Sequence, residues 1–591
     1  MYTINCTLSF FYGVLRVKLF TLDLKPFLPR MSLGLVIKVA GTVVELAIPW
    51  ILSYIIDDLI PLGEMPPVVL WGGLMIVCSL LAWGGNVLAN RMASAVARDV
   101  TRQVRHDLFA KISYLSEGRV DEFTIPSLIS RVTSDTYVLH QTVGMMQRLG
   151  VRAPIMLVGG VIVTLTLDPV LTLIMLATLP IVGVITFFVS RKGAKLFRIV
   201  QKASDDLMRV VRENAVGVRV IKALSKSGYE RERFHRVNDK LTGKERTAEN
   251  TMAVINPVMS LLLNLGIAAV IVVGAYRVQG GVTEVGKIIA FMNLFTIVLN
   301  ALMAINRMFT MLSRAAASSA RVLEVLDTPV ELYEESPKYS FLPKNAPHIA
   351  FRNVTFRYNY GSFALKGLDF SLNRGETLGI IGATGAGKST VIRALMRYYD
   401  IAEGAIEIDG VDIRDYATID LRRKFGVVFQ NDTLFKDTIR ENIRLGRDLD
   451  DAQLIEAARQ AQALEFINEQ GGLDAEVAIK GANLSGGQKQ RLLVARALAG
   501  EPEILVLDDS SSALDYRTDA RLREEIRLHC ENATKIIIAQ RISSIMHAEK
   551  ILVMENGNVV AMGNHEELIR SCELYKEISE SQIGERKLVG Q

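Results

Sequence analysis

The sequence predicts a membrane domain of six α-helices followed by a soluble α/β domain, and three observations support this. Half of the 591 residues are hydrophobic, yet 22% are charged, so apolar and polar parts coexist in a chain long enough for two or more domains. Six apolar stretches, each near the ~20 residues that cross a bilayer, precede Ala315. From His348 onward, short β-branched strands alternate with helices, as in α/β domains.

The change in composition along the chain sets the predicted boundaries. We place the membrane domain at residues 1–312, a linker at 313–347 and the soluble domain at 348–591. Leu8–Phe20 is largely apolar but interrupted by Arg16 and Lys18, and no small-residue cleavage site follows it. This segment is therefore predicted to be an amphipathic elbow helix on the membrane surface. The linker contains prolines that stop helix propagation, namely Pro329, Pro337, Pro343 and Pro347.

The six predicted spans are recognised by their apolar length alone. The Asp168-Pro169 dipeptide separates two of them and predicts a tight helical hairpin, because such a pair turns the chain. The spans are Leu33–Ile56, Val68–Leu88, Ala153–Leu167, Val170–Val189, Pro257–Tyr276 and Gly286–Met311.

The distribution of Lys and Arg between the links predicts the orientation. The short links after the first and third spans contain neither residue, and the link after Tyr276 contains only Arg277. The long links Arg91–Arg148 and Arg191–Arg246 are rich in both. Positive charge favours the cytoplasm, so both termini, the long links and the soluble domain are predicted to be cytoplasmic, in a multi-pass protein of the cell membrane.

The long links are predicted to be helical, because they contain few glycines or prolines. The spans would then continue as helices beyond the bilayer. Each link has a small interruption, at Phe123–Pro126 and at Gly217–Gly228. We interpret these as short crosswise helices that dock on the soluble domain; the alternative is ordinary loops between helices.

A few polar residues fall inside the spans, where they usually face protein or a water-filled cavity. Glu45 would either attract a cationic substrate or pair with a neighbouring helix. Lys38 is expected to extend its ammonium group to the cytoplasmic interface. The sixth span contains Asn293, Asn300, Asn306 and Arg307.

The overall charge and the cysteines argue against two other protein classes. The formal net charge is only +5, and basic loops at a membrane surface explain it better than nucleic-acid binding. The cysteines are far apart and have no metal-binding spacing, which favours reduced structural thiols in contact with a cytosol. They are Cys6, Cys78, Cys530 and Cys572.

A phosphate-binding loop is the first strong motif of the soluble domain. It follows a predicted strand, Leu378–Ile381, and precedes a helix that runs through Leu395, which is the context that G-x-x-x-x-G-K-[ST] requires. Glycines let backbone N–H groups face a phosphate, the lysine adds a full charge, and the serine hydroxyl can bind Mg²⁺. The loop consists of Gly382, Ala383, Thr384, Gly385, Ala386, Gly387, Lys388 and Ser389, with Thr390 directly after it. The motif predicts ATP and Mg²⁺ as cofactors.

A second run, Leu484–Arg491, opens a helix that continues through Ala497 and leaves an exposed helix N-terminus, a natural anion site. With this run after a phosphate loop, the soluble domain and the six spans resemble a half-transporter of the ATP-binding cassette exporters, in the B-type multidrug-exporter fold (the type I or type IV exporter fold). The resemblance covers nearly the whole chain.

The resemblance implies roles for residues of the chain's own nucleotide site. Tyr358 would stack on adenine. Ser389, Gln430 and Asp508 would hold the metal, and Gln430 would also contact the docking helices.

The resemblance also implies a site shared between two chains. In the family two nucleotide domains face each other head to tail, so Ser485, Gly486, Gly487 and Gln488 would clamp the γ-phosphate bound by the opposite domain. Ser512–Asp515 matches the loop that crosses between the domains, and Asp515 is its last residue. A second half-transporter is therefore an expected partner.

The departures from the family pattern are more informative. The catalytic-glutamate position is Asp509, which reaches less far by one C–C bond, ~1.5 Å, and a base must lie within hydrogen-bond distance of its proton. The switch-histidine position is Gln540, whose amide cannot carry a proton as histidine does. Random drift would explain one such change; two in one catalytic site favour a selected loss of hydrolysis. A further departure is Ala478-Ile479, where relatives have Gly-Glu, and it affects how this segment contacts the second docking link.

The sequence thus predicts a subunit of a heterodimeric ATP-driven exporter with a degenerate ATP site of its own. Hydrolysis, coupled to transport by alternating access, would occur mainly at a partner site that the Ser485–Gln488 run completes. The substrate is expected to be hydrophobic or amphipathic, such as a drug or a lipid. The alternatives are a homodimeric slow exporter or lipid flippase, and a nucleotide-gated regulatory or channel-like protein; the six spans exclude a soluble DNA-repair-type ATPase.

Overall fold

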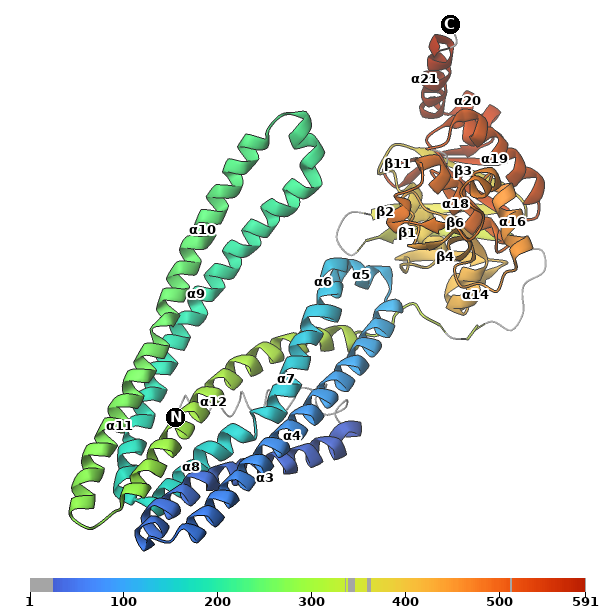
Figure 1. Cartoon of the computed structure of the whole chain (residues 1–591). Helices are drawn as coiled ribbons and strands as arrows, with labels where there is room; N and C mark the ends of the chain where they lie inside the picture. Colours follow the sequence, from blue (N-terminus) through green and yellow to red (C-terminus); the bar gives the residue numbers. More distant parts are fainter. Residues whose placement is uncertain (1–24, 335, 339–345, 359–362, 511–512, 590–591) are drawn as a thin grey trace. The chain divides into compact units, whose positions relative to one another are not determined.

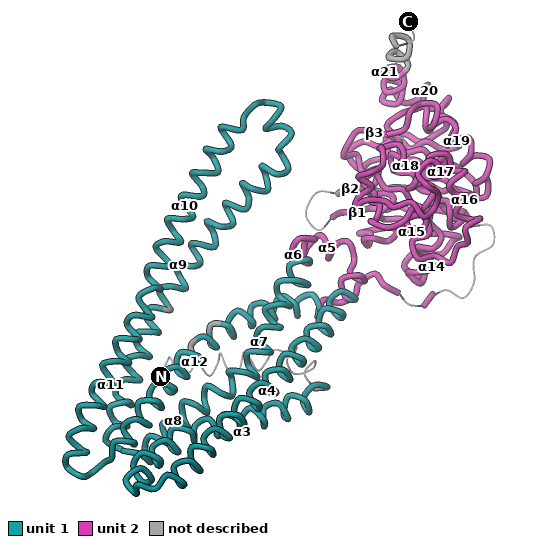
Figure 2. The backbone as a smooth tube through the Cα atoms, viewed as in Figure 1, with its two compact units in different colours: residues 1–110, 129–327 teal, residues 111–128, 328–591 magenta. Residues whose placement is uncertain are grey.

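The computed structural model describes residues 25–334, 336–338, 346–358, 363–510 and 513–589. The chain forms two compact units: residues 1–110 with 129–327, and residues 111–128 with 328–591 (Figure 2). The second unit thus combines the tip of the first long link with the whole nucleotide domain. The predicted elbow helix, Leu8–Phe20, lies outside the described residues.

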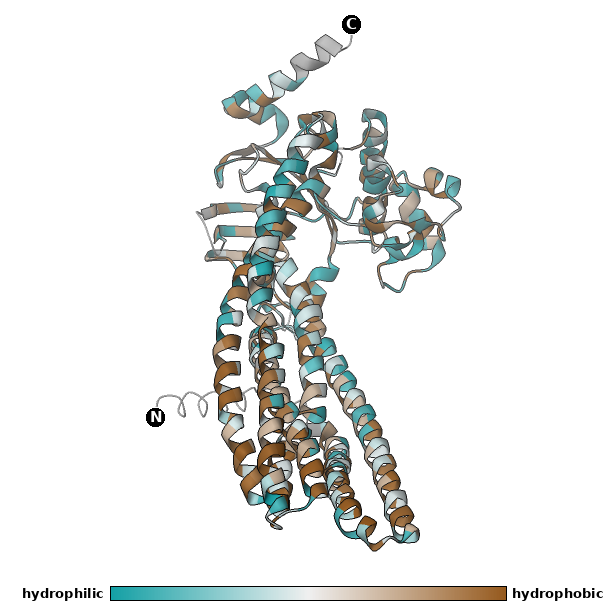
Figure 3. Cartoon of the chain, turned by 60° about the vertical axis from the view of Figure 1, so that its left-hand side comes forward, coloured by the Kyte–Doolittle hydropathy of each residue, from teal (hydrophilic) through white to brown (hydrophobic). Residues whose placement is uncertain are grey.

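Long helices build the first unit (Figure 1). Six of the described helical segments are long and apolar enough to cross a membrane, which confirms the predicted spans, and their hydrophobic stretches stand out in Figure 3. The π-helix Ile55–Leu59 and the 3₁₀ turn Ile60–Leu62 extend the first of these segments. The helices from the membrane domain and its cytoplasmic extensions are α3 (Leu28–Tyr54), α4 (Met65–Ser113), α5 (Glu117–Phe123), α6 (Ile125–Ser130), α7 (Thr136–Arg148), α8 (Arg152–Leu167), α9 (Pro169–Ala223), α10 (Ser227–Ala253), α11 (Ile255–Gln279) and α12 (Val285–Leu326).

The hairpin predicted at Asp168-Pro169 is confirmed. Helix α8 ends at Leu167, and the Asp168 side chain caps α9 by accepting hydrogen bonds from the backbone N–H groups of Val170 at 2.9 Å and Leu171 at 3.2 Å. Asp168 is only 2% exposed, and its other carboxylate oxygen accepts from Arg277 Nε at 2.9 Å. The single arginine of the short links therefore ties the α8–α9 turn to the end of α11.

Replacing Arg277 by methionine is expected to destabilise the membrane domain by about 3 kcal/mol, the lower end of the cost of leaving a buried carboxylate without its cation. The unfolding midpoint of the purified protein in detergent measures this effect. The double variant Asp168→Asn with Arg277→Met removes both charges and should recover part of the loss. Equal midpoints for the wild type and the Arg277→Met variant would contradict this role of the ion pair.

The two long links differ in structure. In the first, the short helix α5 ends at Phe123, and Thr124, at φ +64°, separates it from α6. In the second, the prediction of a crosswise helix is wrong: α9 runs to Ala223, a three-residue turn follows, and α10 starts at Ser227. The cause is that the isolated Gly217 costs only ~1 kcal/mol inside a helix, too little to end one.

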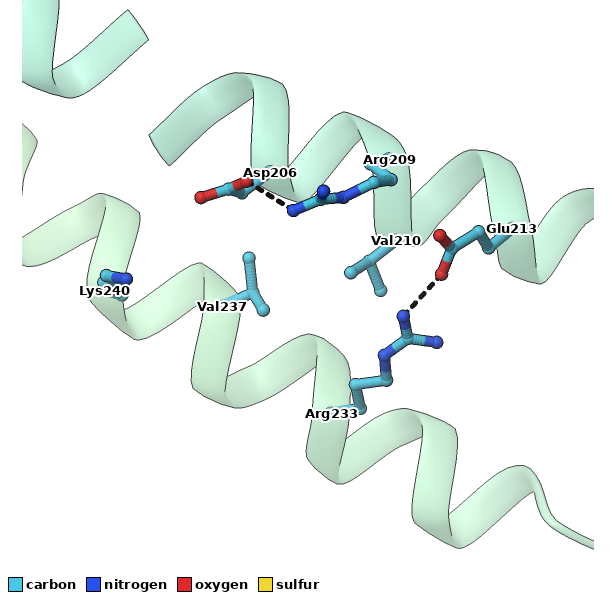
Figure 4. Close-up of a pocket in the computed structure, with 7 residues that line it drawn as sticks. All are labelled: Asp206, Arg209, Val210, Glu213, Arg233, Val237 and Lys240. Carbon is cyan, nitrogen blue, oxygen red and sulfur yellow. Dashed lines mark hydrogen bonds and ion pairs between the residues drawn. The ribbon is translucent and has the colours of Figure 1, made fainter. Parts of the chain in front are cut away.

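Helices α9 and α10 extend as a pair away from α4, α7 and α12 (Figure 1). Figure 4 shows a charged hollow between them, where Arg233 on α10 pairs with Glu213 on α9. Near the turn, Val216 is 83% exposed and Leu224 is 64% exposed. The tip of this pair therefore presents apolar side chains that nothing in the described part of the chain covers.

The polar residues of the first span are paired inside the domain. Glu45 Oε1 accepts from Arg152 at 2.7 Å, which selects the helix-pairing alternative of the two predicted for it. The expectation that Lys38 reaches the interface is wrong: its side chain is buried, and its Nζ donates to Asn90 Oδ1 at 3.1 Å. Asn90, on the neighbouring helix α4, thus accepts a hydrogen bond from Lys38 inside the domain.

The nucleotide domain contains a six-stranded sheet in the order β12-β11-β3-β10-β9-β6, a four-stranded antiparallel sheet, β2-β1-β4-β5, and the pair β7-β8. Strands β11, β3, β10, β9 and β6 are parallel to one another, and β12 is antiparallel to β11. The strands are β1 (Ile349–Arg357), β2 (Phe363–Leu372), β3 (Thr377–Gly382), β4 (Glu403–Ile408), β5 (Val411–Asp412), β6 (Phe425–Val428), β7 (Asp437–Thr438), β8 (Glu476–Val477), β9 (Ile504–Asp508), β10 (Thr534–Ile538), β11 (Lys550–Glu555) and β12 (Asn558–Gly563).

Helices flank the large sheet and bury its apolar strands, of which β9 is buried along its whole length. The strand predicted at Leu378–Ile381 is confirmed as β3. The helices are α13 (Lys388–Leu395), α14 (Thr418–Arg423), α15 (Ile439–Arg444), α16 (Asp451–Gln460), α17 (Leu464–Glu469), α18 (Gly486–Leu498), α19 (Tyr516–His529), α20 (His565–Ser571) and α21 (Glu573–Val589).

Candidate functional site

The predicted site residues gather where parallel strands end. Gly382 ends β3 and Asp508 ends β9, while Gln430 and Gln540 each follow their strand by two residues. Because the carboxyl ends of parallel strands meet at one edge of a sheet, ligands of open α/β sheets bind there. Residues separated by more than 150 positions in the sequence are thereby brought to one edge.

The phosphate loop has the backbone conformation that its glycines allow. A Cβ on Gly382, at φ +155°, would lie 2.0 Å from the Met554 carbonyl oxygen, so only glycine fits. Gly387, at φ +97°, precedes α13, whose N-terminus faces the loop. Lys388 Nζ donates to the carbonyl oxygens of Gly382 and Ala383 at 2.8 Å each. The lysine charge is thus held over the loop, where a phosphate would bind.

The predicted metal residues Ser389, Gln430 and Asp508 line one cavity of about 310 Å³. Burial raises the pKa of the Asp508 carboxyl, and a hydrogen bond with Ser389 opposes that shift. A hydroxyl, an amide oxygen and a carboxylate are the hard oxygen donors that Mg²⁺ prefers, so these residues fit the ion. Bound there, Mg²⁺ would neutralise phosphate charge.

The two departures from the family pattern are in contact with each other. Gln540 Nε2 donates to Asp509 Oδ2 at 3.0 Å. Asp509 has a left-handed backbone, φ +52°, which is uncommon outside glycine. Burial raises the pKa of its carboxyl; Lys388 and a hydrogen bond from Gln430 are among the opposing influences. The shortened acid is therefore held by two glutamine side chains.

Gln490 is a residue of this site that the sequence reasoning did not single out as functional. Its Nε2 donates to the Asp509 carbonyl oxygen at 3.1 Å, and its Oε1 accepts from Ala513 N at 3.0 Å. It lies on α18 inside the run Leu484–Arg491, two residues after the signature run Ser485–Gln488, and this proximity was the available signal. Gln490 connects the signature helix to the loop that carries Asp509.

The signature run starts α18 by a capping box. The Gln488 N–H donates to Ser485 Oγ at 3.3 Å, and the Ser485 N–H donates to Gln488 Oε1 at 2.9 Å. These two bonds leave the N–H groups of Gly486 and Gly487 at the helix N-terminus. The run therefore forms a capped helix N-terminus, and its contact with a partner's phosphate remains a prediction.

Two other predicted residues have local contacts. The Tyr358 ring packs on Phe356 and Tyr399, with its hydroxyl 3.2 Å from Thr390 Oγ1. Asp515 caps α19 by accepting from the Thr518 N–H at 3.0 Å. Adenine stacking by Tyr358 and a contact of Asp515 across the dimer remain predictions, and Ser512 lies outside the described residues.

Glu117 and Arg393 also line the cavity that contains Ser389, Gln430 and Asp508, the metal cavity, and neither was predicted from the sequence. Arg393 lies one turn after Ser389 on α13, so its spacing alone would have placed it on the same face. Glu117 comes from α5 in the first long link, and no local pattern marks it.

Comparison with known proteins adds a family assignment. The family description "ABC transporter transmembrane region" matches residues 31–302, and "ABC transporter" matches residues 365–512. The chain is 37% identical to the ABC transporter ATP-binding protein YfiB of Bacillus subtilis over 567 residues, which cover 95% of this chain and 98% of that protein. It is 33% identical to the ABC transporter ATP-binding protein Rv1273c of Mycobacterium tuberculosis, over 95% of this chain and 97% of that protein.

A solved structure is similar over almost the whole length. A bacterial Atm1-family ABC exporter with ATP bound superimposes with a TM-score of 0.81 at 26% identity, over 95% of this chain and 99% of that chain.

Proposed function

The chain belongs to the ABC transporter family as an exporter half-transporter, and from that premise we propose that it is the degenerate-site subunit of a heterodimeric exporter. It is a multi-pass membrane protein whose cytoplasmic ATPase domain couples ATP hydrolysis to transport.

The contact between Asp509 and Gln540 supports the degenerate site. In this arrangement the carboxylate that would polarise water is ~1.5 Å shorter than glutamate and is hydrogen-bonded to an amide that cannot exchange a proton. The binding groups Lys388, Ser389 and Asp508 are intact. We therefore propose a pocket that holds ATP with Mg²⁺ and hydrolyses it slowly.

Two surfaces support a second half-transporter as partner. The capped N-terminus of α18 begins with the exposed residues Ser485 and Gly486, and we propose that it completes a competent site on the partner. The apolar residues at the tip of α9 and α10, including Val216 and Leu224, are exposed in the single chain. Uncovered apolar patches of this kind mark protein-binding surfaces.

In the proposed cycle, ATP at both sites favours the closed pair of nucleotide domains and an outward-open membrane domain. Hydrolysis at the partner's site resets the exporter. The driving force is the difference in ATP affinity between the two conformations. The proposed location is the bacterial cell membrane, and nucleic acid has no part in it.

The proposed substrate is amphipathic or lipid-like. Because Glu45 is paired with Arg152 and Lys38 is hydrogen-bonded to Asn90, these charges serve the helix packing first. The exposed apolar side chains of α3, such as Val36 and Val43, leave hydrophobic surface for a substrate.

The experiment that tests the proposal follows the nucleotide in this chain's own pocket. The tagged full chain, purified from its native host with whatever half-transporter it retains, is incubated with photoreactive ATP labelled at either the α- or the γ-phosphate. Equal incorporation of both labels is expected in this chain, since its nucleotide stays intact. Loss of the γ label within one turnover of the complex, or full ATPase activity of the chain as a homodimer, would refute it.

A further inference from the structure

The metal cavity of the nucleotide domain has one wall from the membrane domain's first link. Glu117, the first residue of α5, lines it together with Ser389, Gln430 and Asp508. The phosphate loop residues Gly382–Lys388 do not line it. Glu117 therefore lies in the same cavity wall as the predicted metal residues.

The α5 segment is attached to the nucleotide domain by specific bonds. The Tyr399 hydroxyl of that domain donates to Asp121 Oδ2 at 2.7 Å, and Arg119 pairs at 2.5 Å with Glu331 of the linker that precedes the domain. One turn separates Glu117 from Asp121, so both acids face the same side of α5. These contacts fix Glu117 at the cavity wall.

The Glu117 carboxylate has no ion pair among the described residues. It is half-buried and has a hydrogen bond with Tyr399; Arg393 of the cavity wall and Arg422 attract it, but neither forms a salt bridge with it. Asp432, a third acid in the wall, has its own partner, Arg496, at 3.6 Å. A partly buried carboxylate without a cation is unfavourable, and a divalent ion beside Ser389 and Asp508 would supply the charge.

We propose that Glu117 is a positioning residue for the Mg²⁺ of this site, through water held between them, and that the metal thereby secures the first docking segment to the nucleotide domain. Glu117 of the first link would then face the same ion as Ser389 and Asp508 of the nucleotide domain. This inference rests on the proposed function in one respect, that the chain's own pocket binds and keeps ATP.

The test compares Glu117→Gln with Glu122→Gln in the full chain. Glu122 lies on the same short helix, is exposed, and pairs with Arg119 at 2.8 Å without lining the cavity, so it is a matched control. The probe is a fluorescent trinitrophenyl-ATP, titrated with and without MgCl₂. Loss of an outer-shell ligand typically weakens metal affinity about tenfold or more.

Glu117→Gln is expected to affect nucleotide binding differently with and without MgCl₂. In Glu117→Gln, the MgCl₂ concentration needed for tight nucleotide binding rises about tenfold. Binding of the metal-free nucleotide is unchanged or tighter, because a negative charge near the triphosphate has been removed. Glu122→Gln behaves as the wild type in both conditions.

Hydrogen exchange in the same proteins supplies a second readout. Residues 117–123 are expected to exchange more slowly with ATP and Mg²⁺ than with ATP and EDTA, in the wild type and in Glu122→Gln, and equally in Glu117→Gln. An unchanged Mg²⁺ requirement in Glu117→Gln, or an equal loss of binding with and without metal, overturns the inference. Failure of the wild type to bind the nucleotide at all would instead refute the proposed function.

Discussion

Replacing Asp509 by glutamate and Gln540 by histidine together is expected to raise ATP hydrolysis at this pocket by about 100-fold, the lower end of what a positioned general base contributes. The longer acid extends its carboxylate by ~1.5 Å toward the attacking water. Histidine in place of Gln540 supplies a group that can hold and release a proton. Phosphate release by the purified full chain, with a second copy supplying the signature run, measures the gain.

The single variants and the pH profile serve as controls for this gain. Gln540→His alone leaves the short acid in place and should stay near the unmodified rate. In the double variant, activity should fall as the pH drops below about 6.5, because protonated histidine loses its acceptor nitrogen. An unmodified chain that already hydrolyses ATP as fast as the double variant would contradict the degenerate-site proposal.

The membrane spans and the central strands could be predicted because their signals are local. An apolar run of ~20 residues has few alternatives to a membrane helix. The strand before Gly382 and the strand that ends at Asp508 are recognised by β-branched runs next to motif residues. Asp168-Pro169 combines a helix N-cap with a proline at the first helical position, so one dipeptide was sufficient.

Other features depend on contacts that no local pattern records. Gly217 suggested a break in the second link, but α9 continues past it to Ala223. Lys38 and Glu45 of α3 are hydrogen-bonded to Asn90 and Arg152 on other helices. Only the packing of α3 against those helices determines these pairs.

The same limit applies to the candidate site. The motif residues carry their own signature, whereas Glu117 reaches the metal cavity from a segment 272 residues before Ser389. Its spacing to every motif is arbitrary, so nothing short of the fold could have associated it with the nucleotide.

The asymmetric exporter makes a second prediction of large effect: in the purified complex, Gly486→Asp in this chain should reduce ATP hydrolysis by about 100-fold or more, whereas Lys388→Ala should leave most of it. The aspartate would place a negative charge at the helix end proposed to clamp the partner's γ-phosphate, and loss of one such donor site costs about 10²–10³-fold in rate. Lys388 serves only this chain's own slow pocket. Phosphate release at saturating ATP measures both variants.

Gly486→Ala is the matched control, because an added Cβ would meet only the Ala513 Cβ at 3.4 Å, an ordinary contact. It should keep activity close to the wild type, so that the loss in Gly486→Asp is due to the charge and not to volume. In a homodimer every pocket contains both Lys388 and the Ser485–Gln488 run, and Lys388→Ala would then inactivate the complex as fully as Gly486→Asp. The ratio of the two residual activities therefore separates an asymmetric exporter from a symmetric one, whatever substrate the exporter carries.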